Sequence, residues 1–226
     1  MASSRYGAGP RRALGGSVSI DAVIFDYGKV LSGPPEAAAE EQMFAATGVE
    51  RGLAVELYQK HRPAYDEGEL DGLAYWRTIL TGAGAAATDG KVRELAELDA
   101  RMWTVFDPAL VAWQKRLKTA GIRTAILSNM GDVVQKSICG AFDWIEGFDV
   151  RVWSHELRLL KPDPAIFAHV LERLALRPEQ CLFLDDARQN VEGAERCGMH
   201  AICYTDVASL RRELAAIDRS DNLPRP

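Results

Sequence analysis

Residues 22–33 read AVIFDYGKVLSG, and this segment decides how the rest of the chain is interpreted. The apolar run Ala22–Phe25 is typical of a buried strand in a parallel sheet, and it stops abruptly at Asp26. Gly28 follows in a predicted turn. A carboxylate at this point is exposed at the carboxyl edge of the sheet, where open α/β folds bind their ligands. Asp26 is therefore a candidate nucleophile, although Asp also caps helices and occupies turns without any chemistry.

Two further predicted strands and turns carry polar residues suited to a phosphate. The strand Thr124–Leu127 ends at Ser128 and Asn129, whose hydroxyl and amide groups can donate to phosphate oxygens together with the N–H groups of the turn. A helix cap beside a turn is the structural alternative for these two residues. Lys161 precedes a Pro-Asp-Pro sequence that predicts a helix start, and a solvated surface charge is its alternative.

The segment CLFLDDARQN, residues 181–190, joins a predicted strand to two adjacent acids. Asp185 and Asp186 repel each other unless a cation or hydrogen bonds compensate, and oxygen ligands of this kind suit Mg²⁺. Helical spacing places Asn190 on the same face as Asp186. The segment favours a metal site, with an acidic loop as the alternative.

In this order, the four segments resemble the motifs of the haloacid dehalogenase superfamily of hydrolases, from about Asp21 to about Tyr204. The DD doublet with its following N and EGA, together with LSN and KPDPAIF, is most similar to the branch of the bacterial sugar-1-phosphate phosphatases and the amino-terminal phosphatase domain of soluble epoxide hydrolase. The resemblance implies an α/β fold, a Rossmann-like parallel-sheet core with a small helical C1-type cap inserted after the first strand. It also implies a Mg²⁺-dependent phosphatase, acting on a small phosphorylated metabolite such as a sugar phosphate.

The resemblance assigns roles to individual residues. Asp26 would attack phosphorus and form an aspartyl-phosphate. The phosphoryl group would be held by Ser128, Asn129 and Lys161. Mg²⁺ would be held by Asp26, the backbone carbonyl of Gly28, Asp186 and, directly or through water, Asn190, with Asp185 nearby.

One position departs from the family pattern. Phosphatases of the superfamily usually carry a second Asp two residues after the nucleophile, as the acid that protonates the leaving oxygen, and this chain has Gly28 there. Such an acid contributes about 10²- to 10⁴-fold in rate. His61, Tyr65 and Glu67, in a polar segment of the inserted region, are candidates to replace it or to contact the substrate. Helix packing is the alternative for the first two.

The segment between the first two motifs is too long for a simple crossover and carries helical patterns, so it predicts the cap. We expect an α/β core at 19–31 and 108–218, a helical cap at 32–107, and disordered termini at 1–18 and 219–226. The expected strands are Ala22–Phe25, Thr124–Leu127, Val150–Trp153, Cys181–Leu184 and Ala201–Tyr204. The expected core helices are Pro108–Ala120, Asp132–Cys139, Pro164–Ala175, Asn190–Cys197 and Ala208–Ile217.

Composition argues against some classes of binding partner. A net charge of -5 with dispersed signs argues against nucleic-acid binding, and no apolar run reaches the ~18 to 20 residues that cross a bilayer. The four cysteines form no metal-binding pattern, which predicts reduced core residues in a cytoplasmic protein. We expect a monomer or a homodimer.

Two other functions fit the same motifs. A 2-haloacid dehalogenase would use the same Asp26 without a metal, although Asp186 would repel its carboxylate substrate and the residues after Asp26 lack that branch's Tyr-Gly-Thr order. A weak phosphate-binding or regulatory protein is the alternative that Gly28 favours.

Overall fold

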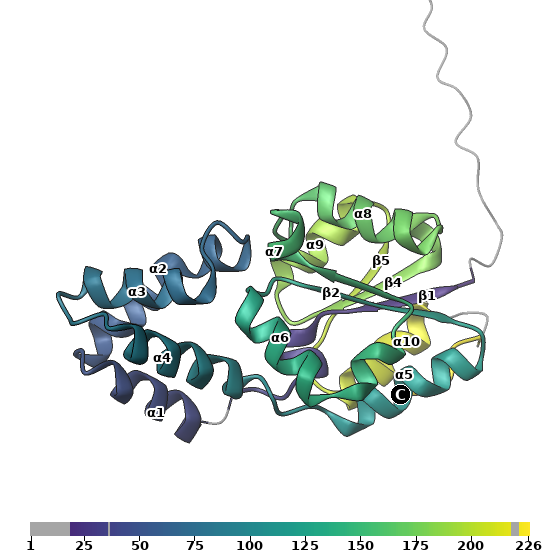
Figure 1. Ribbon diagram of the computed structural model, residues 1–226. Coiled ribbons are helices and arrows are strands. Elements are labelled where there is room, and N and C mark those ends of the chain that lie inside the picture. The colour runs from purple at the N-terminus through teal and green to yellow at the C-terminus, as the bar shows by residue number, and fades with distance from the viewer. Residues whose placement is uncertain (1–18, 36, 218–221) are drawn as a thin grey trace, which may run out of the picture.

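The computed structural model describes residues 19–35, 37–217 and 222–226 (Figure 1). Its centre is a five-stranded parallel sheet with the order β3-β2-β1-β4-β5. The strands are β1 (Ala22–Phe25), β2 (Arg123–Ser128), β3 (Val150–Trp153), β4 (Cys181–Asp185) and β5 (His200–Cys203). All five lie where the apolar runs predict them, and the α/β fold class is confirmed.

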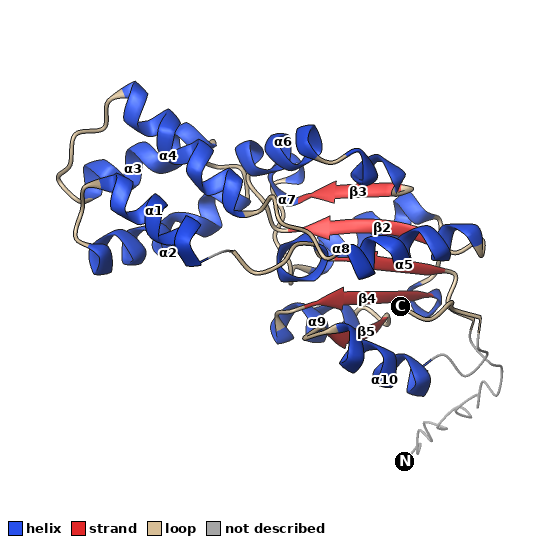
Figure 2. Ribbon diagram, turned by 90° about the horizontal axis from the view of Figure 1, so that it is seen from below, coloured by secondary structure: helices blue, strands red, loops and turns tan. Residues whose placement is uncertain are grey.

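Alternation along β1 directs side chains into two separate cores. Ala22 and Ile24 face one side of the sheet, while Val23 and Phe25 face the other, and all four are fully buried. Helices cover both faces (Figure 2). One face carries α5 (Pro108–Thr119), α6 (Asp132–Ala141) and α10 (Val207–Ile217), and the other carries α8 (Pro164–Leu174) and α9 (Arg188–Arg196). The sheet is therefore buried on both sides, which accounts for its continuous apolar runs.

Short helical turns complete the core, and all of them lie in connections between the longer elements. They are η1 (Tyr27–Leu31), η2 (Asp143–Gly147), α7 (Ser154–Leu157) and η3 (Pro178–Gln180). The turn η1 begins directly after Asp26, so the candidate nucleophile stands between the end of β1 and this turn.

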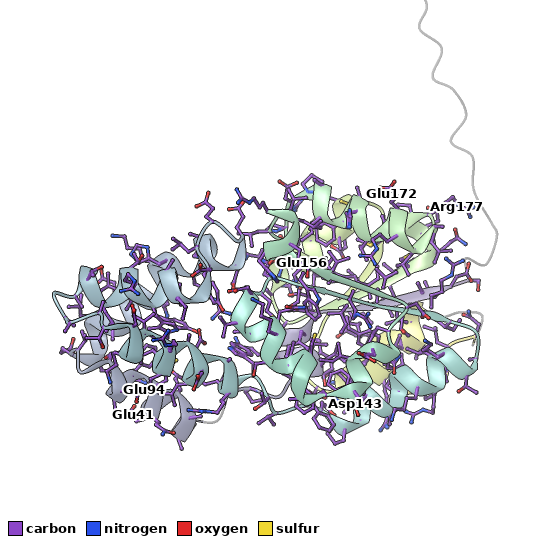
Figure 3. All side chains as sticks on the ribbon, viewed as in Figure 1. Glu41, Glu94, Asp143, Glu156, Glu172 and Arg177 are labelled. Atoms are coloured by element: carbon purple, nitrogen blue, oxygen red, sulfur yellow. The ribbon has the colours of Figure 1, made fainter. Side chains whose placement is uncertain are left out.

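The inserted segment folds into four helices beside the carboxyl edge of the sheet (Figure 1). They are α1 (Ala37–Thr47), α2 (Arg51–Asp66), α3 (Gly72–Gly82) and α4 (Asp89–Met102). An isolated antiparallel bridge between Ser32 and Phe106 joins the two connections to the core, and the Asp107 amide donates to the Leu31 carbonyl at 2.8 Å. We call these four helices the cap. Charged side chains such as Glu41 and Glu94 lie on its outer surface (Figure 3).

The carboxyl terminus differs from the sequence-based expectation. Residues 222–226 pack on the core: Leu223 is 5% exposed, Trp113 Nε1 donates to the Pro224 carbonyl at 2.6 Å, and the Arg211 guanidinium donates to the Pro226 carbonyl. The expectation of a disordered tail is wrong for these five residues, because a buried apolar side chain and satisfied carbonyls hold them. The predicted extension 1–18 and residues 218–221 lie outside the described residues.

Two smaller expectations can be compared with the structure. The four cysteines form no disulfide, and Cys181 alone of them is fully in the core, while Cys139, Cys197 and Cys203 are half-buried. Within the described part of the chain, no helix has both the length and the apolar character needed to span a lipid bilayer.

Candidate active site

Asp26 stands at the point where β1 ends. Its backbone N–H donates to the Leu184 carbonyl of β4 at 2.8 Å, which continues the sheet by one residue, and its Oδ1 accepts the Tyr27 N–H at 2.7 Å. The side chain is almost completely buried. Burial raises the pKa of Asp26 to about 6, against the opposing effect of the Lys161 ammonium. The Asp26 carboxylate is thus ionised at neutral pH, although the Lys161 ammonium offsets only part of the cost of burying its charge.

Lys161 bridges the ends of two neighbouring strands. Its Nζ lies 2.9 Å from Asp26 Oδ1 and 2.6 Å from Asp185 Oδ2, and the residue is 3% exposed. Burial acts to lower the pKa of Lys161, but the two carboxylates outweigh it and raise that pKa above the ordinary lysine value. The group is therefore a fixed cation beside the candidate nucleophile.

Asn129 positions the loop that carries this lysine. Its Nδ2 donates to the Lys161 carbonyl at 3.1 Å, and its Oδ1 accepts the Lys161 N–H at 2.8 Å. Both side-chain ends are thus occupied by the backbone of Lys161, which leaves Ser128, buried at the end of β2, as the freer of the two predicted phosphate donors. Ser128 also interacts with Asp26 and helps to lower its pKa, after the larger effect of Lys161.

Three carboxylates gather at this edge. Asp26, Asp185 and Asp186 each place an oxygen within 4.8 Å of the others. Asp185 is fully buried and paired with Lys161, whereas the Asp186 side chain is 30% exposed and faces the cavity described below. Asn190 Nδ2 donates to both oxygens of Asp185, at 3.0 and 3.1 Å.

The chemistry of this donor set fits a hard divalent cation. Carboxylates converge on one point, and the buried Asn190 Oδ1 is an acceptor without a hydrogen-bond partner among the described residues. Asp26 and Asp186 meet as predicted, with Gly28 lining the same cavity. Asn190 contacts Asp185 rather than Asp186.

Gly28 and Lys29, which follow Asp26 in the turn η1, make contacts that the sequence does not reveal. A Cβ on Gly28 would lie 3.4 Å from Cζ3 of the Trp103 ring, and the Tyr27 hydroxyl donates to the Trp103 carbonyl at 2.8 Å. Trp103 is therefore within ordinary contact distance of the position where the family's acid stands, and Gly28 lines the same cavity as Asp26. Lys29 adopts a positive φ of 56°, which is unfavourable for a residue with a side chain, and its Nζ lies 3.5 Å from Asp186 Oδ2.

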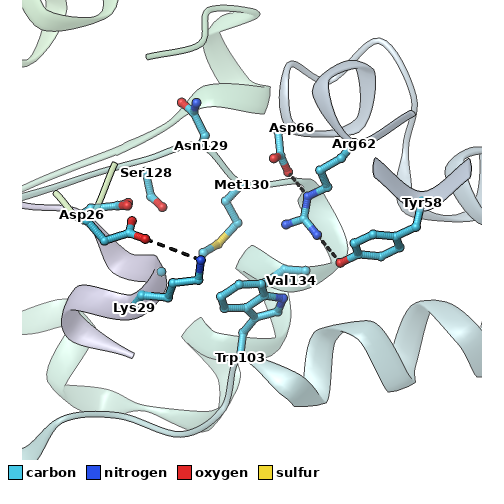
Figure 4. A pocket seen from close by; sticks show the side chains of 12 residues that line it. Asp26, Lys29, Tyr58, Arg62, Asp66, Trp103, Ser128, Asn129, Met130 and Val134 are labelled. Carbon is cyan, nitrogen blue, oxygen red and sulfur yellow. Dashed lines mark hydrogen bonds and ion pairs between the residues drawn. The ribbon is translucent and has the colours of Figure 1, made fainter. Parts of the chain in front are cut away.

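These residues surround a cavity of about 290 Å³ between core and cap (Figure 4). The core supplies Asp26, Gly28, Lys29, Ser128, Asn129, Met130, Val134 and Asp186, and the cap side supplies Tyr58, Arg62, Asp66 and Trp103. Tyr58, Arg62 and Asp66 are spaced four residues apart in α2 and so share one face of the helix.

The predicted cap residues do not line this cavity. His61, Tyr65 and Glu67 belong to the same stretch of α2 and its end but lie off the lining face. Tyr65 is buried and stacks on Tyr75, with ring centroids 4.6 Å apart, as the packing alternative anticipated. The four-residue spacing of polar side chains in α2 is the signal that could have identified the lining face instead.

Comparisons with known proteins agree with this geometry. The haloacid dehalogenase-like hydrolase family model matches residues 20–198. The chain is 27% identical to a phosphatase of Mycobacterium tuberculosis over 192 residues, 81% of this chain and 87% of that protein. It is 32% identical over 108 residues to rat bifunctional epoxide hydrolase 2, which covers 45% of this chain and 19% of that enzyme.

The fold is shared with solved structures of the same family. A variant of a family enzyme from Bacteroides thetaiotaomicron, in complex with magnesium and inorganic phosphate, superposes with a TM-score of 0.68 at 19% identity, covering 83% of this chain and 95% of that chain. The chain spans less than half the length of the first curated relatives that it matches. Because the family model covers most of its residues, the chain belongs to the haloacid dehalogenase-like hydrolase family.

Proposed function

We propose that this hydrolase is a Mg²⁺-dependent phosphomonoesterase that acts on a small phosphorylated metabolite. The observation that carries the proposal is the position of Lys161 Nζ, 2.9 Å from Asp26 and 2.6 Å from Asp185, beside a cluster of three carboxylates. Phosphoryl transfer requires a positioned nucleophile and positive charge against the phosphoryl oxygens, and both are available here. The similarity to a phosphatase of Mycobacterium tuberculosis supports the same activity.

In this proposal Asp26 is the nucleophile. A carboxylate oxygen of Asp26 forms a bond to phosphorus while the bond from phosphorus to the leaving oxygen breaks, and the leaving oxygen takes a proton from water, which gives an aspartyl-phosphate and an alcohol. Water then attacks the phosphorus of this acyl phosphate and loses a proton to solvent, the bond from phosphorus to Asp26 breaks, and inorganic phosphate leaves as the Asp26 carboxylate is regenerated. Lys161 holds the carboxylate in place and neutralises the transferring group, and the Ser128 hydroxyl donates to it.

The metal would be held by Asp26 and Asp186, with Gly28 beside them. Enzymes of this family generally use Mg²⁺, and the Bacteroides neighbour was solved with it. When bound, the ion supplies positive charge that lets a carboxylate approach a phosphate dianion. Lys161 neutralises the charge of Asp185, and the Asn190 amide donates a hydrogen bond that orients this carboxylate beside the metal site.

Gly28 favours a second candidate function. Since glycine has no side chain to protonate the leaving oxygen, the chain is without the usual acid two residues after the nucleophile. A protein of this kind could bind phosphorylated ligands and turn them over slowly, as a regulatory protein would. The experiment below separates the two.

The test is hydrolysis of a panel of metabolite phosphates, with Mg²⁺ and with EDTA. The native chain should release phosphate only with the metal, and Asp26→Asn should lose at least about 10³-fold in kcat. Asp89→Asn, a matched change of an exposed carboxylate that pairs with Arg77 in the cap, should retain activity. Turnover that persists in Asp26→Asn or in EDTA would refute the mechanism, and phosphate binding without turnover would favour the regulatory function.

A further inference from the structure

The cap end of the cavity contains an ion network that the proposed chemistry does not use. Arg62 Nε lies 2.8 Å from Asp66 Oδ1, and Arg62 Nη1 lies 2.6 Å from the Tyr58 hydroxyl and 3.8 Å from Asp99 Oδ1. The Arg62 and Asp66 side chains are 19% and 13% exposed, and Asp99 is buried. Burying this many polar groups is unfavourable unless each is paired, and here most of them are.

Aromatic rings fix the guanidinium in one orientation. The Arg62 Cζ lies 5.6 Å from the Tyr58 ring centroid, 5.5 Å from that of Tyr65 and 5.8 Å from that of Trp103. The Tyr58 hydroxyl donates in turn to Asp99 Oδ1 at 3.0 Å. Arg62 is therefore a rigid donor group that faces Asp26 across the cavity (Figure 4).

Arg62 already has carboxylate partners within the network. Asp66 Oδ1 lies 2.8 Å from Arg62 Nε, and Asp99 Oδ1 lies 3.8 Å from Arg62 Nη1. Burial raises the pKa of Asp66 to about 6, a value that leaves this carboxylate ionised at pH 7.5. The guanidinium is therefore not a spare cation for a second anionic group of a substrate. The other basic side chain that lines the cavity, Lys29, lies at the opposite end, where it contacts Asp186.

A donor and an acceptor thus stand side by side on the cavity wall. Arg62 N–H groups can donate, the Asp66 carboxylate can accept, and Trp103 and Tyr58 add ring faces. A hydroxyl group both donates and accepts, so it satisfies both partners. A carboxylate or a second phosphate cannot donate to Asp66 and would meet it as a like charge.

We propose that Arg62 and Asp66 form a subsite for an uncharged, hydroxylated leaving group, so that the enzyme selects phosphate esters of polyols or sugars over phosphorylated acids. This inference rests on the proposed phosphatase function. The cavity volume of about 290 Å³ lies at the small end of ligand pockets and restricts the leaving group to a small molecule.

The test compares two esters that differ in one group: glycerol 3-phosphate carries a terminal hydroxymethyl where 3-phosphoglycerate carries a carboxylate. Binding is measured by calorimetry with Mg²⁺ on the Asp26→Asn protein, which does not need to hydrolyse either ester. Glycerol 3-phosphate should bind at least about tenfold more tightly. Equal or tighter binding of 3-phosphoglycerate, or binding of neither ester, would overturn the subsite.

A second variant distinguishes a role of Asp66 in recognising the leaving group from a role in holding the cap together. Asp66→Asn in the same background retains the side-chain shape and removes one negative charge, so it should improve binding of 3-phosphoglycerate relative to glycerol 3-phosphate by about tenfold. Asp89→Asn should leave the ratio unchanged. If Asp66→Asn weakens both esters equally, the pair only holds the cap together and the inference fails. A preserved preference without hydrolysis by the native chain would instead refute the phosphatase function alone.

Discussion

Replacing Lys161 by Met should destabilise the protein far more than loss of a surface lysine. The substitution leaves Asp26 and Asp185, both buried, without their shared cation. At an effective dielectric constant of about 20, the attraction at these distances is about 6 kcal/mol for each pair before desolvation is subtracted. Because burying the ammonium costs several kcal/mol, we expect a net loss of about 3–5 kcal/mol in the free energy of unfolding at pH 8.

The loss should depend on pH in a defined direction. Burial raises the pKa of Asp26 in the folded protein to about 6, above its pKa in the unfolded chain. The contribution of Asp26 to the free energy of unfolding is therefore fully present below the unfolded pKa and is lost as the pH rises through 6. Without Lys161 the pKa in the folded protein rises further, and the penalty at pH 8 grows. Near pH 4 Asp26 is protonated in both proteins, so the difference in the free energy of unfolding between Lys161→Met and the native chain should be smaller than at pH 8.

Urea unfolding in EDTA, at pH 8 and at pH 4, measures both effects. The matched control is Lys118→Met, which breaks a pair 2.9 Å long between half-exposed Lys118 and Asp149 and should cost about 1 kcal/mol or less. A loss below about 1 kcal/mol for Lys161→Met at pH 8, or an equal loss at both pH values, would refute the argument that Lys161 compensates two buried carboxylates.

Three further changes test other features of the structure. Gly28→Asp should change the free energy of unfolding by about 1 kcal/mol or less and raise kcat by about tenfold or more, because a Cβ there makes an ordinary 3.4 Å contact with the Trp103 ring and places an acid beside the cavity, and an unchanged kcat would contradict this. Lys29→Met should tighten Mg²⁺ binding about 3- to 10-fold in calorimetry, since it removes a cation 3.5 Å from Asp186, and unchanged affinity would show that Lys29 does not compete there. Deleting residues 222–226 should cost about 2 kcal/mol or more in urea unfolding, and full stability after deletion would mean that the packed tail is dispensable.

The core could be predicted from the sequence because its signals are local. The strands Ala22–Phe25 and Val150–Trp153 have the predicted bounds, since the first is a short apolar run that ends at Asp26 and the second is rich in valine and tryptophan. The start of α8 is also as predicted, because Asp163 accepts the Ala165 N–H at the helix start and Pro164 follows at the first helical position. The helix α9 begins two residues earlier than predicted, at Arg188, because Asp185 accepts the Ala187 N–H and sets the turn.

The cavity-lining face of α2 and the packing of the carboxyl terminus could not be predicted, because both depend on contacts between distant segments. The face of α2 that meets the core is set by how the cap packs on the core. The polar turn and the resemblance to the family's cap segment indicated His61, Tyr65 and Glu67, whereas another face of α2 lines the cavity. The packing of Leu223 depends on the environment of Trp113, which lies more than a hundred residues earlier in the chain. No local pattern reports either contact.

The position of Gly28 joins these local and distant features. The sequence reveals that the usual acid is missing, and the structure adds that Trp103, from the end of the last cap helix, lies beside this position in the cavity lining. The core therefore supplies no acid at Gly28, because glycine has no side chain to donate a proton. If the enzyme turns over esters efficiently, the leaving group must either be a good one, such as an anomeric hydroxyl, or be assisted from the cap wall. Arg62 and Asp66 are the cap groups that face that leaving group, so the missing acid and the proposed hydroxyl selectivity depend on the same wall of the cavity.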